Sequence, residues 1–468
     1  MARAIEEYCI ISDSPGERRA LSFKNNRPVD FLVRRPEKKF PMRHDVYMAK
    51  VEQWSPGLGG VFMCLGDAGK AFMPAPKGAS LKPGGLYPVT VVRSPVGEKR
   101  ARVSMDVVFS SARMLLIPEK KGVHLSHRAK QRAGQAGQLI LHNLKQAGLD
   151  GLLIRESALS FPIDVLVHEA CFLTERVKAF HEEAKRAKSP CLMRYATHYL
   201  DWFIADILPT GTVQIGCDVL FNEMRMRWHH LCPDLTPNII PIDANKADAL
   251  IDEQMEVFLR QKVPFGNVGE LVFDHTEALT AIDINAFSGH KKTPRHQFNL
   301  NMQAIPEIAR HIRLRNIGGP IIIDFLNMPD DQSCQAIETE MKKAFMSDPC
   351  DTRILPISAL GMMQMSREKA GLSVGETYLE PRKDMVMSFE TVALNLVRMV
   401  ARRAKEFPDR RLVLVCHPDF IEWIKHKPYY SDMIAKDIQD KLHWKSDAKI
   451  ESRSPYMTVA GISEPFFI

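Results

Sequence analysis

The chain has 468 residues, of which 45% are hydrophobic and 25% are charged, and it carries a formal net charge of +7 at neutral pH. This composition excludes a disordered or fibrous chain and is typical of a globular protein with two to four domains. The mild positive charge permits a polyanionic partner without requiring one.

Residues 42–107 contain short alternating strands separated by Gly, Pro and Asp turns, and five such strands fit an OB-fold barrel. Phe62 and Phe72 flank the turn LGDAGK, so a hairpin would place both rings on one face, where unpaired bases stack. Lys99, Arg100 and Arg102 add positive charge for a nucleic-acid backbone. The alternative, which the spacing alone favours, is that both phenylalanines belong to the barrel core.

Between residues 108 and 205 the sequence predicts a helix over residues 133–147, a strand in LDGLLIRES and a long helix rich in acidic and basic residues. A basic stretch, residues 120–132, precedes them, and such a stretch is more often a solvated face than a phosphate-binding site. The pattern over residues 206–265 is strand, helix, strand, helix.

Two aspartates interrupt apolar, β-branched runs in the second half of the chain: Asp283 in TAIDIN and Asp324 in PIIIDF. Between them, residues 307–315 have helical spacing, with Pro306 at the first turn and Gly318-Gly319 at the end. A strand, a helix and a strand of this length predict a βαβ unit with parallel strands. Both acids would then lie near the carboxyl edge of one sheet, where α/β proteins usually bind ligands.

An unpaired carboxylate is costly inside a buried strand, so two of them on one βαβ unit indicate a shared divalent cation. Carboxylate ligands with few sulfur or imidazole neighbours favour Mg²⁺, with Mn²⁺ as the alternative ion. Strand alternation places Asn285 on the face of Asp283, where it would orient a ligand carboxylate or a water. Arg310 or Arg313 would contact phosphate or, more commonly for a helix surface, face the solvent. The competing interpretation is that each aspartate caps a turn or pairs with an arginine.

After residue 378 the polar stretch PRKD indicates a linker. A long amphipathic helix, SFETVALNLVRMVARRAKEF, opens the last domain and is followed by the strand LVLVC and the helix PDFIEWIKH. No apolar run is as long as a membrane span, and the N-terminus lacks an apolar signal core. Nine cysteines without C-x-x-C spacing indicate reduced thiols, as in a cytoplasmic protein.

The runs EALTAIDIN, EIARHIRLRNIGGPIIIDF and GMMQMSREK closely resemble the catalytic core of the bacterial ribonuclease E/G family, most strongly over residues 265–375. The resemblance implies that Asp283 and Asp324 hold a catalytic Mg²⁺ and that Asn285 belongs to the same site. It implies a cytoplasmic endoribonuclease that hydrolyses single-stranded RNA to 5′-phosphate ends, in RNA processing, including rRNA processing, or in decay. It allows a homodimer, and no zinc is expected because the C-x-x-C pair that shares zinc between subunits in part of the family is absent.

The fold class that the resemblance implies is α/β, in the sense of a multidomain α+β chain. Its parts are a ribonuclease-H-like subdomain with an inserted OB-fold barrel, a 5′-end-sensor-like subdomain, a DNase-I-like catalytic subdomain and a small α/β C-terminal domain closer to the ribonuclease G branch. The expected bounds are 1–41 and 206–265 for the ribonuclease-H-like subdomain, 42–107 for the barrel, 108–205 for the sensor-like subdomain, 266–378 for the catalytic subdomain, 379–387 for the linker and 388–468 for the last domain.

The resemblance assigns RNA binding to Phe62, Phe72 and Lys99 on the barrel and to Arg155 in the sensor-like subdomain. Glu156 follows this arginine where the family has a threonine. A carboxylate beside a phosphate is repulsive, so this change disfavours recognition of a 5′-monophosphate.

Four further positions of the catalytic core have lost a charged residue of the family pattern: Gln303, Asn327, Ala359 and Gln364. Such losses next to a metal site often reduce activity by about tenfold to a hundredfold. A second interpretation is therefore an RNA-binding protein with a weakened or lost nuclease site. A third, a phosphate-handling enzyme for small molecules, explains the two aspartates but not the barrel.

Overall fold

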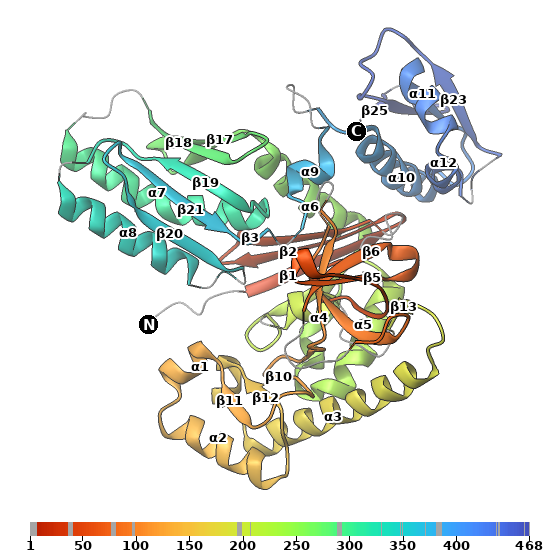
Figure 1. Ribbon diagram of the computed structural model, residues 1–468. Coiled ribbons are helices and arrows are strands. Elements are labelled where there is room, and N and C mark those ends of the chain that lie inside the picture. The colour runs from red at the N-terminus through yellow and green to blue at the C-terminus, as the bar shows by residue number, and fades with distance from the viewer. Residues whose placement is uncertain are drawn as a thin grey trace.

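The computed structural model shows a mixed α/β protein, and its described residues form five sheets (Figure 1). No helix among the described residues is long and apolar enough to cross a membrane. The described residues are 7–35, 41–75, 81–95, 99–193, 199–205, 207–287, 293–328, 330–346, 348, 350–369, 371–380, 386–436, 438, 440–462 and 464–467.

Two distant parts of the chain build the first sheet, in the order β15-β14-β1-β2-β3. Its N-terminal strands are β1 (Glu7–Ser14), β2 (Glu17–Lys24) and β3 (Arg27–Arg34). β14 (Thr212–Ile215) joins β1 in parallel and β15 (Ile239–Pro241) follows it. With α5 (Asp218–Leu231) and α6 (Ala244–Leu259), these strands confirm the predicted alternation of strand and helix over residues 206–265.

The inserted barrel is closed by five strands. In spatial order they are β4 (Val46–Ser55), β5 (Gly60–Cys64), β6 (Lys70–Pro74), β8 (Ala101–Ser104) and β7 (Leu86–Arg93), and β7 pairs back onto β4. A short strand, β13 (Cys191–Leu192), extends the edge of β4. This closed barrel is compatible with the expected OB-fold.

A third, four-stranded sheet follows, in the order β11-β12-β10-β9. One hydrophobic core unites it with the first sheet, through residues such as Ile11, Met114 and Ile215. The helix predicted over residues 133–147 is present as α2. The elements are β9 (Phe109–Ser110), β10 (Met114–Leu116), β11 (Val123–Leu125), α1 (His127–Arg132), α2 (Gly134–Gln146), β12 (Leu152–Ile154), α3 (Ile163–Arg186) and α4 (Tyr199–Ile204).

The two aspartates lie in a six-stranded sheet, called here the aspartate sheet, with the order β16-β17-β18-β19-β21-β20. Two helices, α7 (Pro294–Leu314) and α8 (Asp331–Phe345), pack on one of its faces and share a hydrophobic core with it (Figure 1). The strands are β16 (Lys262–Phe265), β17 (Gly269–His275), β18 (Thr280–Ala286), β19 (Gly319–Asp324), β20 (Thr352–Ile357) and β21 (Met362–Arg367).

Helix α7 is longer than the sequence predicted. It begins at Pro294 rather than near residue 307, so Pro306 lies inside the helix and not at its first turn. An interior proline costs about 3 kcal/mol, but the long buried stripe of this helix supplies packing on both sides of it. The helix ends at Leu314, and Asn316 then adopts the left-handed conformation, with φ 49°. The helix therefore ends before Gly318-Gly319, where the sequence predicted its end. The stripe consists of Leu300, Ala304, Ile305, Ile308 and Ile312.

The C-terminal part contains the predicted helix, strand and helix as α10, β22 and α11, and Figure 1 shows it well separated from the aspartate sheet. The predicted linker, PRKD, lies outside the described residues. The small sheet has the order β23-β22-β24-β25. The elements are α9 (Val374–Tyr378), α10 (Phe389–Glu406), β22 (Leu412–Cys416), α11 (Pro418–Lys425), α12 (Pro428–Ala435), β23 (Leu442–Ser446), β24 (Tyr456–Val459) and β25 (Phe466–Phe467).

Candidate active site

Asp283 and Asp324 lie directly opposite each other on adjacent strands. β18 and β19 run parallel, and their register pairs Asp283 with Asp324. Register partners project from the same face of a sheet, and neighbouring strands are about 4.8 Å apart. The two carboxylates therefore point outward side by side. The predicted βαβ unit is confirmed, with α7 as its crossover helix.

Both aspartates are exposed, although the isoleucine run before Asp324 is typical of a strand buried on both faces. Only one face of β18 and β19 is buried, through alternating residues such as Ile282 and Ile323, against α7 and α8. On the opposite face, called here the open face, Ile322 is half-buried. An exposed carboxylate keeps its hydration and remains accessible to a cation, so no buried partner is needed to offset its charge.

Asn285 contacts the aspartate pair. Its Nδ2 donates a 2.9 Å hydrogen bond to Oδ2 of Asp283, because residues two apart on a strand share a face. The ion pairs of the described residues include neither Asp283 nor Asp324. This finding disagrees with the alternative interpretation that each aspartate pairs with an arginine.

Asn301 of α7 holds the backbone that follows Asp324, and the sequence analysis missed it. The side chain is fully buried and donates a 2.8 Å hydrogen bond to the carbonyl oxygen of Leu326. The backbone N–H of Leu326 donates in return to Oδ1 of Asn301 over 3.1 Å. The Nδ2 and the Oδ1 of Asn301 thus both hold the backbone of Leu326 in place. The signal in the sequence was a polar residue within the apolar stripe of a helix.

The donor set of the aspartate pair fits Mg²⁺. This ion usually binds one or two carboxylates and keeps several waters, so two exposed carboxylates suffice as protein ligands. Among the described residues there is no group of three or more His, Cys, Asp and Glu side chains that could hold a metal ion. A divalent ion at the pair would therefore complete its coordination with water or with substrate oxygens.

Arg310 and Arg313 neither face the solvent nor reach the open face. Arg313 forms a two-point ion pair with Asp30 of β3, with Nε–Oδ1 at 3.0 Å and Nη2–Oδ2 at 2.6 Å. Arg310 binds Glu307 on its own helix, and Glu307 also pairs with Arg27. These ion pairs attach α7 to the first sheet, which contradicts both expected roles of the two arginines.

The four positions at which the resemblance implies the loss of a charged residue are all exposed: Gln303, Asn327, Ala359 and Gln364. Gln364 of β21 is the register partner of Ile322, so it lies on the open face, one strand from Asp324.

Phe62 and Phe72 lie on the outer surface of the barrel. They are register partners on β5 and β6, with ring centroids 5.5 Å apart in an edge-to-face arrangement. Both are half-buried, whereas Val61 points inward and is fully buried. The guanidinium of Arg100 lies 4.6 Å from the centroid of the Phe62 ring, and Lys99 is exposed. The structure therefore contradicts the alternative that both rings form the barrel core.

Arg155 follows β12 and is half-buried. Its Nη2 donates a 3.0 Å hydrogen bond to Oγ of Ser110. The neighbouring Glu156 forms an ion pair with Arg132 of α1. A terminal phosphate at this place would have to compete with the carboxylate of Glu156 for the cation of Arg132.

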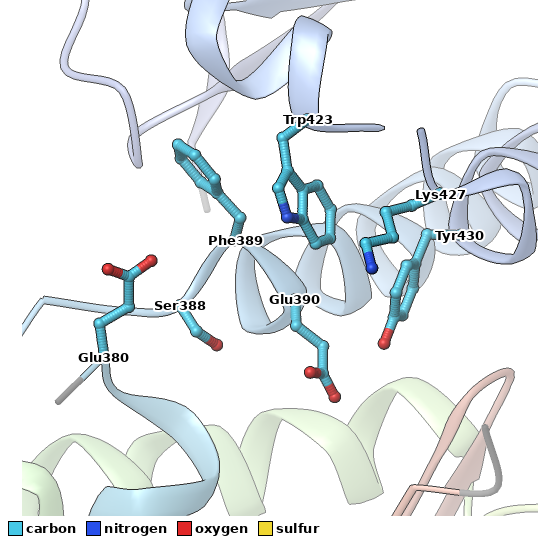
Figure 2. Close-up of a pocket in the computed structure, with 7 residues that line it drawn as sticks. All are labelled: Glu380, Ser388, Phe389, Glu390, Trp423, Lys427 and Tyr430. Carbon is cyan, nitrogen blue, oxygen red and sulfur yellow. The ribbon is translucent and has the colours of Figure 1, made fainter. Parts of the chain in front are cut away.

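A cavity of about 350 Å³ lies on elements that carry neither aspartate, at the N-terminus of α10 and beside α11 and α12 (Figure 2). Aromatic rings form part of its wall, among them that of Trp423. Two carboxylates among the described residues of its wall are engaged with arginines: Glu380 with Arg453 at 2.8 Å and Glu390 with Arg35 at 3.2 Å. The cavity thus belongs to the joint that attaches the C-terminal part, and not to the aspartate site.

Comparisons with known proteins point to one family. The model of the Ribonuclease E/G family matches residues 109–370. Ribonuclease G of Haemophilus influenzae is 24% identical over 420 residues, which cover 81% of this chain and 84% of that protein. Ribonuclease G of Escherichia coli K12 is 26% identical over 363 residues, 73% of either chain. Ribonuclease E of a Nostoc species is 25% identical over 359 residues, 71% of this chain and 52% of that protein.

Proposed function

The chain belongs to the ribonuclease E/G family, and we propose that it is a metal-dependent endoribonuclease acting on single-stranded RNA. One observation carries the proposal: the register of β18 and β19 puts Asp283 and Asp324 side by side on the open face of the aspartate sheet. The names of the relatives, ribonuclease G and ribonuclease E, support an activity on RNA.

In this proposal Asp283 and Asp324 are the protein ligands of Mg²⁺, with Mn²⁺ as the alternative ion. When bound, the ion would lower the pKa of a coordinated water and offset the negative charge of the phosphorane-like transition state. Asn285 holds Oδ2 of Asp283 and so limits the rotation of that carboxylate. Asn301 holds the backbone beyond Asp324 through Leu326. Hydrolysis of this kind leaves a 5′-phosphate and a 3′-hydroxyl.

The barrel supports single-stranded rather than duplex RNA as the substrate. Phe62 and Phe72 expose two rings on adjacent strands, and such rings stack with unpaired bases. Lys99 and Arg155 complete the proposed contacts, the first with the RNA backbone and the second near its 5′ end. We also propose a role in RNA processing or decay in the cytoplasm.

The sheet connections support the subdomains that the resemblance implied. Strands β1–β3 and β14–β15 form one sheet although the barrel and the β9–β12 sheet intervene in the sequence, as expected for a ribonuclease-H-like subdomain with insertions. We propose the DNase-I-like identity for the aspartate sheet with α7 and α8. We propose the subdomain bounds that the resemblance implies. We also propose that the protein forms a homodimer.

A second candidate is an RNA-binding protein whose nuclease site is weakened. Gln364 favours it, because this uncharged residue stands on the open face where the family pattern has an acid. The two candidates differ in cleavage but not in RNA binding.

The test is cleavage of a 5′-monophosphorylated, fluorescently labelled single-stranded RNA with Mg²⁺ and with EDTA. We expect cutting that depends on the metal and is lost in the variant Asp283→Asn plus Asp324→Asn. Asp274→Asn is the matched control, because Asp274 is exposed on the same sheet but is the register partner of Ala281. RNA binding without any cutting would favour the second candidate, and cutting by the double variant would place the active site elsewhere.

A further inference from the structure

One row of outward-facing residues crosses all five strands of the barrel. The register pairs Gln53 with Phe62, Phe62 with Phe72, Phe72 with Arg102, and Arg102 with Arg93. The row follows the spatial order of the strands, from β4 across β5, β6 and β8 to β7. All five residues are exposed or half-buried. A β-bulge in β4 and another in β7 shift the register at the two ends of the row, so that Gln53 and Arg93 lie on the outward-facing side of the barrel.

The two arginines of the row are register partners, and no carboxylate of the described residues pairs with either. Neither Arg93 nor Arg102 forms an ion pair with another described residue. Glu52, an acid on β4, is already paired with Lys70 at 2.9 Å. Like charges directly opposite each other destabilise a sheet, whereas a bound phosphate between two guanidinium groups would stabilise the same arrangement.

The arginine end of the row adjoins the aspartate sheet. Arg93 is followed by Ser94, whose Oγ accepts a 3.1 Å hydrogen bond from the backbone N–H of Arg43. The side chain of Arg43 reaches the aspartate sheet at two places: Glu368, just after β21, at 3.5 Å, and the Sγ of Cys350, just before β20, at 3.5 Å. The aromatic end of the row has no such link among the described residues.

We propose that Arg93 and Arg102 bind the sugar-phosphate backbone of a single-stranded RNA between the Phe62–Phe72 rings and the aspartate sheet. The strand then crosses the barrel from β5 toward β7, with its bases stacked first and its phosphates held next. From there it has to follow β21, whose six residues span about 20 Å, to reach Met362, the register partner of Asp324. This inference rests on the proposed function, because it names the path of the same substrate.

The test measures RNA binding rather than cleavage, so it can fail separately from the nuclease assignment. A labelled pyrimidine-rich RNA is titrated with the full chain in EDTA, by fluorescence anisotropy, over a series of salt concentrations. For single strands the slope of log affinity against log salt changes by about 0.7 for each phosphate contact. We expect Arg93→Gln and Arg102→Gln each to reduce the slope by about this amount. Arg102→Lys keeps the charge and should keep the slope.

Arg225→Gln is the matched control, since Arg225 is an exposed arginine on α5, and it should leave the slope unchanged. Phe62→Ala should lower the affinity at every salt concentration without reducing the slope. If both arginine variants bind with the slope of the unaltered protein while Phe62→Ala weakens binding, the inference is overturned and the proposed function stands. If the unaltered protein binds no RNA, both fail. If the arginine variants lose slope but the protein never cleaves, the path is right and the nuclease assignment is wrong.

Discussion

Asp283 and Asp324 occupy one register position of the parallel β18–β19 pair. Two like charges directly opposite each other are unfavourable in a sheet, and no arginine or lysine among the described residues forms an ion pair with either. A divalent cation between them would turn this repulsion into attraction. That relationship, and not the exposure of either acid alone, is the physical reason for proposing a metal site here.

The first prediction concerns Asn285, whose amide donates to Oδ2 of Asp283. Asn285→Ala frees that carboxylate to rotate, and we expect kcat/KM for RNA cleavage to fall by about tenfold to a hundredfold. Because Asn285 is exposed, the free energy of unfolding should change by no more than about 0.5 kcal/mol. A cleavage rate equal to that of the unaltered protein would show that this hydrogen bond has no role in the reaction.

The second prediction concerns the two rings on the barrel. Phe62→Ala and Phe72→Ala should each weaken binding of a single-stranded RNA by about 1–3 kcal/mol, because each removes a stacking surface. Phe62→Tyr keeps the ring and is the matched control. The affinities are measured by fluorescence anisotropy in EDTA. Unchanged affinity in both alanine variants would exclude the platform.

Elements that depend on local sequence patterns could be predicted from the sequence. Alternation around Asp283, the helical spacing after residue 307 and the isoleucine run before Asp324 predicted the βαβ unit, and the structure confirms it. The sequence did not predict that α7 begins at Pro294, because Pro306 is typical of the first turn of a helix. In the folded protein, packing of the apolar stripe outweighs the local preference of one proline.

Contacts between distant segments could not be predicted from the sequence alone. Arg313 pairs with Asp30, which is 283 residues away in sequence, so nothing near Arg313 showed its partner. Asn301 contacts Leu326 only because the fold returns β19 beside α7. The exposure of the aspartates was also missed, since a run of apolar residues does not show whether one or both faces of a strand are covered.

The third prediction concerns pH. Burial raises the pKa of Glu17, but the charges of Arg398, Arg35 and Arg19 outweigh it and lower the pKa from its usual 4.5 to about 2. Because the folded pKa is below the unfolded one, the ionised Glu17 stabilises the fold above about pH 4.5. This contribution is lost as the pH falls from about 4.5 to about 2.

Glu17→Gln should therefore flatten the loss of stability over that acidic window, measured by urea unfolding at a series of pH values. At neutral pH the variant should be less stable by about 3–5 kcal/mol, because it leaves buried arginines without their partner. If the free energy of unfolding has the same pH profile in the variant and in the unaltered protein, Glu17 is not the source of this pH dependence. A matched control is Glu256→Gln, since Glu256 lies at an exposed position.

The fourth prediction concerns the 5′ end of the RNA. Glu156 is paired with Arg132 beside Arg155, so its carboxylate repels a terminal phosphate. We expect similar cleavage rates for RNA with a 5′-monophosphate and with a 5′-hydroxyl. Glu156→Gln should raise the relative rate for the monophosphate by about fivefold, or about 1 kcal/mol. Glu156→Asp keeps the charge and serves as the control. A clear preference for the monophosphate in the unaltered protein would contradict this view.

The measurement that tests the central claim most directly is Mn²⁺ binding, followed by the loss of the free-ion signal in electron paramagnetic resonance. It needs no RNA and therefore separates the metal site from cleavage. We predict one Mn²⁺ site in the unaltered protein and in Asp274→Asn, which changes an exposed acid on the same sheet. The site should be absent in the variant Asp283→Asn plus Asp324→Asn. Retention of that Mn²⁺ by the double variant would contradict the claim that the two aspartates hold the metal.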